Sequence, residues 1–166
     1  MVLMRKWLRT KNKRGFTLIE LLVVIAVMGL LASIATIAYS SVAQNARKRV
    51  ASATINNYWG ITSDYFYVMN SGFGGSPSLY QLCARTGLND RHLALSKSPP
   101  ASDFPSELPA VYVQYDEDPT NVFQRYVIVR LVYQDSEKGK YYYSTDGINT
   151  YGPFDTLAQA SSKQPQ

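Results

Sequence analysis

The sequence predicts an α+β protein in which one long N-terminal helix packs on a small C-terminal antiparallel sheet. The 23 residues from Phe16 to Ala38 carry a single charge and no proline, which predicts an apolar helix. Such a helix is about 34 Å long, and a bilayer core is about 30 Å thick. Residues 16–39 are therefore predicted to cross a membrane. Alternating apolar and polar residues after position 110 predict the sheet.

The helix is predicted to continue as an amphipathic half over residues 40–70. Apolar or aromatic residues recur there mostly at spacings of three or four, at Val42, Ala46, Val50, Ala53, Tyr58, Ile61, Tyr65 and Met69. This is the period of one helix face. The glycine, serine and proline residues of 71–77 then end the helix.

Residues 71–109 are the least regular part of the chain. A short helix is predicted at Ser78–Arg85, and one or two helical turns at Leu88–Leu95. The inward-facing residues of the short helix are expected to be Leu79, Leu82 and Cys83. Four prolines between residues 98 and 109 exclude a regular element there. Because Cys83 is the single cysteine, it is either buried as a small hydrophobic residue, which is preferred, or available for pairing between molecules.

Residues 110–157 are predicted to form three or four antiparallel strands. Apolar residues occupy the odd positions Val111, Val113, Tyr115, Phe123, Val127, Val129, Leu131 and Tyr133. The odd-numbered face of the long strand, from Phe123 to Tyr133, is the more apolar, and we expect it to pack on the amphipathic half of the helix. Glu137–Gly139 is the predicted hairpin turn, and residues 158–166 are predicted to be a disordered polar tail.

The charge of the chain is concentrated at its start. The first 15 residues hold six cations and no acid, whereas the remainder has 11 basic and 12 acidic residues. Cations that precede a membrane span favour the cytoplasmic side, so residues 1–15 are predicted to be cytoplasmic and the C-terminal domain to face outward. Arg47, Lys48 and Arg49 oppose this orientation but are outnumbered.

Glu20 is the charge inside the apolar run. A carboxylate in a membrane helix costs about 2.5–3.5 kcal/mol on insertion scales, and such residues are by default functional. A buried charge needs a partner. The alternative is an ordinary signal anchor in which Glu20 snorkels or is protonated.

The start of the chain resembles the class III signal peptide of type IV prepilins and type II secretion pseudopilins. The resemblance rests on the basic leader, Gly15, Phe16, the run Thr17–Leu21 and the apolar helix. It implies the pilin fold, cleavage by prepilin peptidase between Gly15 and Phe16, and N-methylation of Phe16. It also implies that Glu20 pairs with the N-terminal ammonium of a neighbouring subunit during assembly. Since Gly15 precedes the apolar run, the helix would stay with the mature protein.

The resemblance implies a structural subunit of a type IV pilus or a type II secretion pseudopilus. Such a protein is held in the lipid bilayer of the bacterial inner membrane, with one span, and its segment 71–109 is the variable loop. Its partners would be prepilin peptidase, other pilin or pseudopilin subunits and an inner-membrane assembly platform. The alternative is a membrane-anchored binding module for DNA uptake or adhesion that does not polymerise.

Enzyme activity is not predicted. The sequence has no phosphate loop and no nucleophile elbow, and its single histidine, His92, is expected to be a loop residue. Thirteen tyrosines could stack on nucleic acid, but from Val50 onward 8 basic residues stand against 11 acidic ones. Because nucleic-acid binding needs a positive surface, these tyrosines are interpreted as sheet and core packing, and nucleic acid is not expected as a partner.

Calcium is the one cofactor with candidate ligands. Hard oxygen ligands occur in predicted loops at Asp116, Asp118, Asp135 and Asp146. Major pseudopilins bind calcium in a C-terminal loop, and Asp146-Gly147 is similar to part of that motif, although the rest of the motif is not evident. The alternative is that these acids are solvated turn residues, and no cofactor is assigned.

Overall fold

The computed structural model describes residues 15–73, 75–99, 104–105, 107–121, 123–136 and 139–162. Its contacts divide the chain into two units, Met1–Ala43 and Gln44–Gln166, which are taken in turn. Helix α1, Leu18–Val68, contributes to both units. The predicted α+β class, a long N-terminal helix on a largely antiparallel sheet, is confirmed.

The length of helix α1 follows from the absence of proline within it and from a glycine just after it. No proline interrupts its 51 residues, so its backbone hydrogen bonds continue without a break. A single π-helical turn, η1 (Met69–Phe73), follows, and Gly72 within it has a φ of +83°. This positive φ is readily adopted by glycine and terminates the helix. The stop predicted at residues 71–77 is therefore confirmed.

The first unit is the apolar part of α1. Every described residue from Gly15 to Val42 is exposed, including Leu18 at 82% and Ile37 at 75%. A helix that is apolar on all sides is stable only where other apolar material surrounds it.

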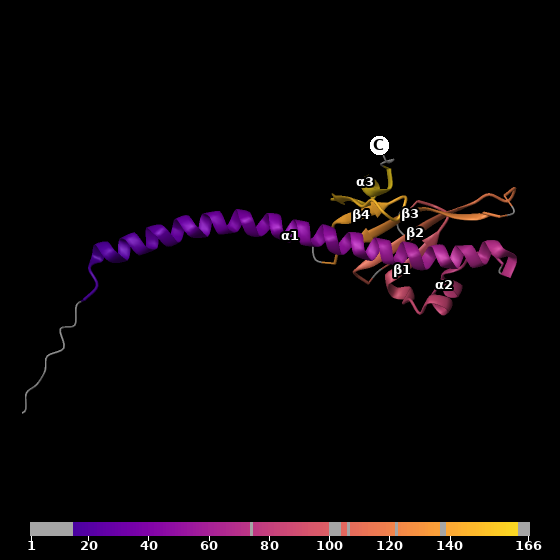
Figure 1. Ribbon diagram of the computed structural model, residues 1–166, viewed down its shortest axis with the longest axis horizontal. Coiled ribbons are helices and arrows are strands. Elements are labelled where there is room, and N and C mark those ends of the chain that lie inside the picture. The colour runs from indigo at the N-terminus through magenta and orange to yellow at the C-terminus, as the bar shows by residue number, and fades with distance from the viewer. Residues whose placement is uncertain are drawn as a thin grey trace, which may run out of the picture. The chain divides into compact units, whose positions relative to one another are not determined.

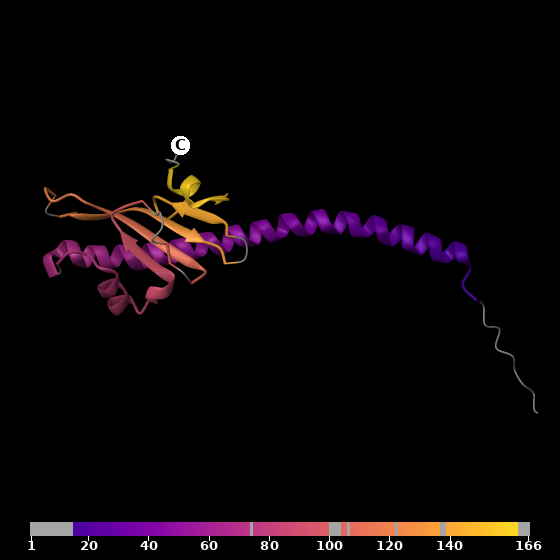
Figure 2. The same ribbon diagram turned by 180° about the vertical axis from the view of Figure 1, so that it is seen from behind.

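The second unit contains one five-stranded sheet in the order β1-β2-β3-β4-β5. The strands are β1 (Leu93–Ser96), β2 (Ala110–Glu117), β3 (Tyr126–Gln134), β4 (Tyr141–Ser144) and β5 (Tyr151–Phe154). The β1–β2 pair is parallel, and the other three pairs are antiparallel. Figures 1 and 2 show the C-terminal half of α1 running along this sheet, with helix α3 (Leu157–Ser162) beside β4.

The main core lies between α1 and the sheet. Ile55, Val113 and Leu131 are fully buried in it, and Tyr65 and Tyr133 are nearly so. Burying an aliphatic side chain of this size stabilises a fold by about 1.5–3 kcal/mol. The apolar face predicted for residues 40–70 is wrong in its first half, where Val50 and Ala53 are exposed and Ala51 and Ile55 are buried instead. Helix α2 (Leu79–Thr86) adds Leu82 to the core. The predicted helix at Ser78–Arg85 is thereby confirmed to within one residue at each end, and the Ser78 hydroxyl caps it by accepting from the Gln81 N–H.

A second apolar cluster covers the opposite face of the sheet. It contains Tyr112, Val132, Tyr143 and Ala160 of α3, all at most 2% exposed. Arg130 donates from Nη1 to the backbone oxygens of Ala160 and Ser161. The prediction of a disordered tail from residue 158 is therefore wrong up to Ser162, because sheet contacts far away in the sequence order this segment. Residues 163–166 lie outside the described residues.

Strand β1 was not predicted. Leu88–Leu95, expected as one or two helical turns, instead holds the 3-10 turn η2 (Asp90–His92) and most of β1. The prediction was wrong because β1 is four residues long and is stabilised by parallel pairing with β2, such as Leu93 with Val111. The residues of β1 alone do not predict that pairing.

The predicted inner face of β3 is correct only for its second half. Gln114 pairs with Arg130 and Tyr115 with Ile128, which leaves Val129 as an extra residue. This β-bulge moves every earlier residue of β3 to the other face. Val127 and Val129 are consequently 41% and 38% exposed, while Tyr126 and Ile128 contact the core. The expected inward position of Phe123 is also wrong, since it precedes the strand and is 87% exposed.

Candidate processing and assembly site

The predicted cleavage bond lies in a short segment outside the helix. Gly15, Phe16 and Thr17 have no regular secondary structure, and α1 begins at Leu18. The Phe16 side chain is 76% exposed. A peptide bond in a helix is held by hydrogen bonds, so a bond just before α1 is the more accessible one for a peptidase. The basic residues that precede it in the sequence, up to Arg14, lie outside the described residues.

Glu20 and Thr17 form a capping box at the start of α1. The Thr17 N–H donates to Glu20 Oε2 at 2.9 Å, and the Thr17 hydroxyl donates to the same oxygen at 2.8 Å. In return the Glu20 N–H donates to Thr17 Oγ1 at 3.3 Å, and the Thr17 carbonyl accepts from Leu21 N–H at 3.2 Å. This reciprocal arrangement satisfies helix N–H groups that would otherwise have no partner.

The capping box uses one oxygen of the Glu20 carboxylate. Both hydrogen bonds from Thr17 end at Oε2, and within the described part of the chain Oε1 accepts no hydrogen bond. A carboxylate has about four acceptor positions. Glu20 can therefore hold Thr17 and still accept a donor from another molecule.

The helix beyond Glu20 has the properties of a membrane span. It is strongly apolar, and its most apolar stretch is not buried within the protein. Among the described residues it is the one helix long and apolar enough to cross a bilayer. The length and composition fit anchoring in a membrane.

Residues 10–36 match the family model described as the prokaryotic N-terminal methylation motif. This motif is the class III signal peptide of type IV prepilins and pseudopilins. The match spans the predicted cleavage bond, the capping box and much of the apolar helix, and it supports a pilin-like or pseudopilin-like precursor. The motif's family is structural and not enzymatic. Comparison with curated proteins and with solved structures gave no match.

The four calcium candidates each have partners within the protein. Asp116 accepts from Glu117 N–H at 2.8 Å, Asp118 accepts from Thr120 N–H at 2.9 Å, and Asp135 lies 3.4 Å from Arg47 Nη1. Among the described residues no group of three or more His, Cys, Asp or Glu side chains could hold a metal ion. Calcium binding stays a prediction, which a calorimetric titration with millimolar calcium tests.

Asp146 organises the turn between β4 and β5. Its Oδ1 accepts from the N–H groups of Ile148 at 2.9 Å and Asn149 at 2.8 Å, and its Oδ2 accepts from the Asn149 amide at 2.7 Å. These hydrogen bonds favour the carboxylate and lower the pKa of Asp146 to about 2. The adjacent Gly147 has a φ of +73° and lies so close to the Trp59 ring that a Cβ there would be 2.4 Å from it. Asp146 thus has a structural role in docking this turn against α1.

His92 and Cys83 have structural surroundings. Nδ1 of His92 lies 3.1 Å and 3.0 Å from the carbonyl oxygens of Glu107 and Pro109, to which it donates as an N–H. Cys83 is half-buried and packs against the main core, as preferred from the sequence, and burial raises its pKa. A thiol in this state is protonated and weakly reactive.

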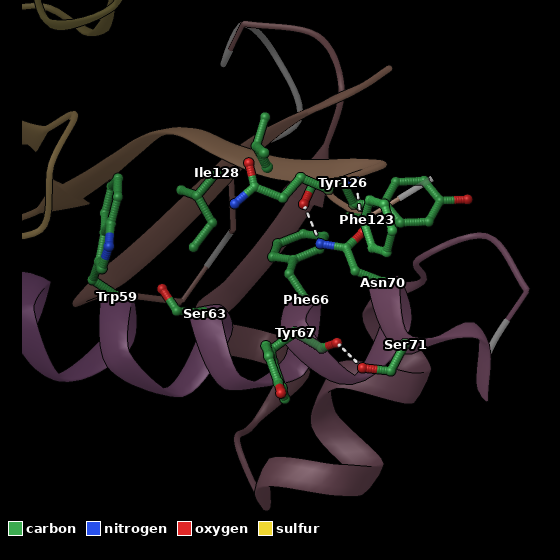
Figure 3. Close-up of a pocket in the computed structure, with 11 residues that line it drawn as sticks. Trp59, Ser63, Phe66, Tyr67, Asn70, Ser71, Phe123, Tyr126 and Ile128 are labelled. Carbon is green, nitrogen blue, oxygen red and sulfur yellow. Dashed lines mark hydrogen bonds between the residues drawn. The ribbon is translucent and has the colours of Figure 1, made fainter. Parts of the chain in front are cut away.

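A groove at the far end of α1 was not predicted from the sequence. It has a volume of about 590 Å³ and lies between the last turns of α1, the loop before β3 and the start of β3. Its lining residues are Trp59, Ser63, Phe66, Tyr67, Asn70, Ser71, Phe123, Gln124, Tyr126, Val127 and Ile128. Figure 3 shows Trp59, Ser63 and Phe66 along α1, with Ile128 and Tyr126 across from them on β3. No sequence signal indicated the groove, since Phe123, which lines it and is exposed, was expected to face inward.

Proposed function

We propose that the protein is a structural subunit of a type IV pilus or a type II secretion pseudopilus. The observation that carries this proposal is the methylation motif at residues 10–36, which includes the start of an apolar helix that its own chain leaves uncovered. Such a helix must be surrounded by lipid before assembly and by neighbouring helices after it. The same surface thus serves as a membrane anchor and as an assembly interface.

Prepilin peptidase is proposed to cut between Gly15 and Phe16 and to methylate the new N-terminus. The bond is suited to this reaction because it lies outside α1 beside an exposed Phe16. The cut removes six cations and creates one ammonium group at Phe16. The mature chain therefore begins with a single positive charge at the apolar end of the helix.

Glu20 is proposed to pair with the N-terminal ammonium of a neighbouring subunit. Its Oε2 is held by Thr17, while its Oε1 is directed to no donor among the described residues. The capping box fixes the carboxylate before assembly, so less conformational freedom is lost when the pair forms. In an apolar surrounding, the attraction of one opposite charge sets the axial register of the two helices.

Before assembly the proposed location is the bacterial inner membrane, with the N-terminus in the cytoplasm and the second unit outside it. The six cations of the leader support this orientation. Other pilin subunits and an inner-membrane assembly platform are the proposed partners.

Surface filaments test this function. Cells are sheared, filaments are sedimented, and the pellet is probed with an antibody against residues 44–162. The protein is expected in the pellet together with other subunits. Its complete retention in the membrane fraction of filament-bearing cells would instead favour a binding module on a simple anchor.

A further inference from the structure

The groove at the end of α1 has a rigid floor. Phe66 and Tyr126 are 3% and 4% exposed and belong to the main core. The Asn70 side-chain amide donates to the Tyr126 carbonyl at 2.9 Å, and the Tyr126 N–H donates to Asn70 Oδ1 at 2.8 Å. This pair of hydrogen bonds, visible in part in Figure 3, fixes the end of α1 to the start of β3. The groove is therefore formed before any ligand arrives.

The rim of the groove exposes apolar surface. Phe123 is 87% exposed, and Val127, which lines the same groove, is 41% exposed. The half-buried Trp59 lines the same groove from α1. Exposed aromatic rings beside a preformed hollow are typical of a surface that another molecule covers.

The lining of the groove carries no charge. All eleven lining residues are neutral, and five of them are aromatic. The nearby Arg125 is ion-paired with Glu117, with 2.7 Å between Nη2 and Oε1. A phosphate or a nucleic-acid backbone would find no counter-charge here, although both depend on one.

The polar groups of the groove favour an occupant that can hydrogen-bond over a purely apolar one. Within the described part of the chain, neither the Ser63 hydroxyl nor the Gln124 side-chain amide takes part in a hydrogen bond with the protein. An alkyl chain or an apolar peptide side chain would remove these groups from water without supplying partners, which is unfavourable. The occupant needs flat C–H faces for the rings and hydroxyl groups for the amide and the serine.

We propose that this groove binds a neutral oligosaccharide. A pyranose ring presents an apolar C–H face that stacks on an aromatic side chain and equatorial hydroxyl groups that bond to amides. Phe123 and Trp59 would supply the stacking surfaces, and Gln124 and Ser63 the polar contacts. The assignment does not depend on filament assembly, because all of these residues lie within the second unit.

Trp59 provides a site-specific reporter of binding. The chain has two tryptophans, Trp7 and Trp59, so a full-length Trp7→Phe protein fluoresces from the groove alone. This protein is kept in an amine-oxide detergent, since glycoside detergents would compete, and is excited at a wavelength that tyrosine does not absorb. It is titrated with cellotriose, maltotriose, mannotriose and tri-N-acetylchitotriose. At least one saccharide is expected to change the Trp59 emission in a saturable way.

Phe123→Ser and Tyr80→Ser are matched variants for this titration. Both remove an exposed aromatic ring, 87% exposed at Phe123 and 82% at Tyr80, but Tyr80 lies on α2 and does not line the groove. Phe123→Ser is expected to weaken saccharide binding by about tenfold, and Tyr80→Ser by less than about twofold. The proposal is overturned if no saccharide of the panel changes the emission, or if the two variants bind equally well. A response to an apolar peptide such as tri-leucine in place of the saccharides would also overturn it.

Discussion

The two units of this chain obtain their stability in opposite ways. Residues up to Val42 of α1 expose all of their large apolar side chains, whereas the continuation of the same helix buries Ile55 and Tyr65 against a sheet. The first stretch depends on lipid or on other subunits, and the second folds on its own core. In the first part of α1 apolar residues lie on all sides of the helix, whereas in the second part they lie on one face. The same helix is therefore suited to lipid or subunit contacts in its first part and to packing on a sheet in its second.

This difference predicts that damage in one unit leaves the other intact. A change at Glu20 should affect assembly without unfolding the sheet. A change in the core should unfold the sheet without affecting membrane insertion. The predictions below separate the two units, beginning with the largest effect.

Glu20→Ala should remove the protein from filaments almost completely. Removing one member of a buried ion pair costs about 3–5 kcal/mol, which is enough to abolish recruitment. The variant should still insert and lose residues 1–15. Filament content is measured by immunoblot of sheared pellets. Asp64→Ala, which removes an exposed acid from the second unit's part of the same helix, is the control. Normal filament incorporation of Glu20→Ala would refute the role proposed for Glu20.

Ile55→Ala should destabilise the second unit by about 2–5 kcal/mol, since it leaves a cavity at a fully buried site of the main core. Urea unfolding in detergent, followed by the near-ultraviolet circular dichroism of the tyrosines, measures the change. Val50→Ala, at a position on the same helix that is 57% exposed, should alter stability by less than about 0.5 kcal/mol. Equal losses for both variants would contradict the assigned helix face.

Gly147→Ala should be more destabilising than Gly139→Ala. Both glycines have positive φ, +73° and +57°, which costs an alanine about 1–2 kcal/mol. At Gly147 the added Cβ also meets the Trp59 ring, whereas at Gly139 it meets no described atom within 4 Å. The unfolding free energies of Gly147→Ala and Gly139→Ala are compared. Their difference measures the cost of disturbing the contact between the turn and Trp59 of α1. No difference would mean that the turn does not dock on Trp59.

The stability of the second unit should fall between about pH 4 and pH 2, in part because of Asp146. Its pKa is about 2 in the folded chain and about 3.9 when unfolded. The stabilisation is therefore fully present above pH 4 and is lost as the pH falls through the folded value. Thermal unfolding is measured at pH 5 and at pH 2.5. The drop in unfolding temperature between these two pH values should be smaller for Asp146→Asn than for the unchanged protein. An equal or larger loss for Asp146→Asn would contradict this origin.

Features set by neighbouring residues were predictable from the sequence. The extent of α1 follows from its uninterrupted composition and the glycines after it, and the Ser78–Arg85 helix follows from its own pattern. The cleavage bond and Glu20 were named from a local motif. The capping box was missed, although the Thr17–Glu20 spacing is a known signature of one.

Features that join distant parts of the chain were not predictable. The face of β3 depends on a bulge opposite Gln114 and Tyr115, and β1 depends on pairing with β2. Helix α3 is ordered by Arg130, which is 30 residues from Ala160 in the chain. The groove was likewise hidden, because the Asn70–Tyr126 bonds that build its floor join residues 56 apart.

Intact mass and N-terminal peptide analysis of the protein from its native membrane test the central claim most directly. The account predicts a chain that begins at Phe16 and carries one methyl group on its terminal nitrogen. A chain that still carries residues 1–15 would contradict it, and the apolar helix would then be a simple anchor for the second unit.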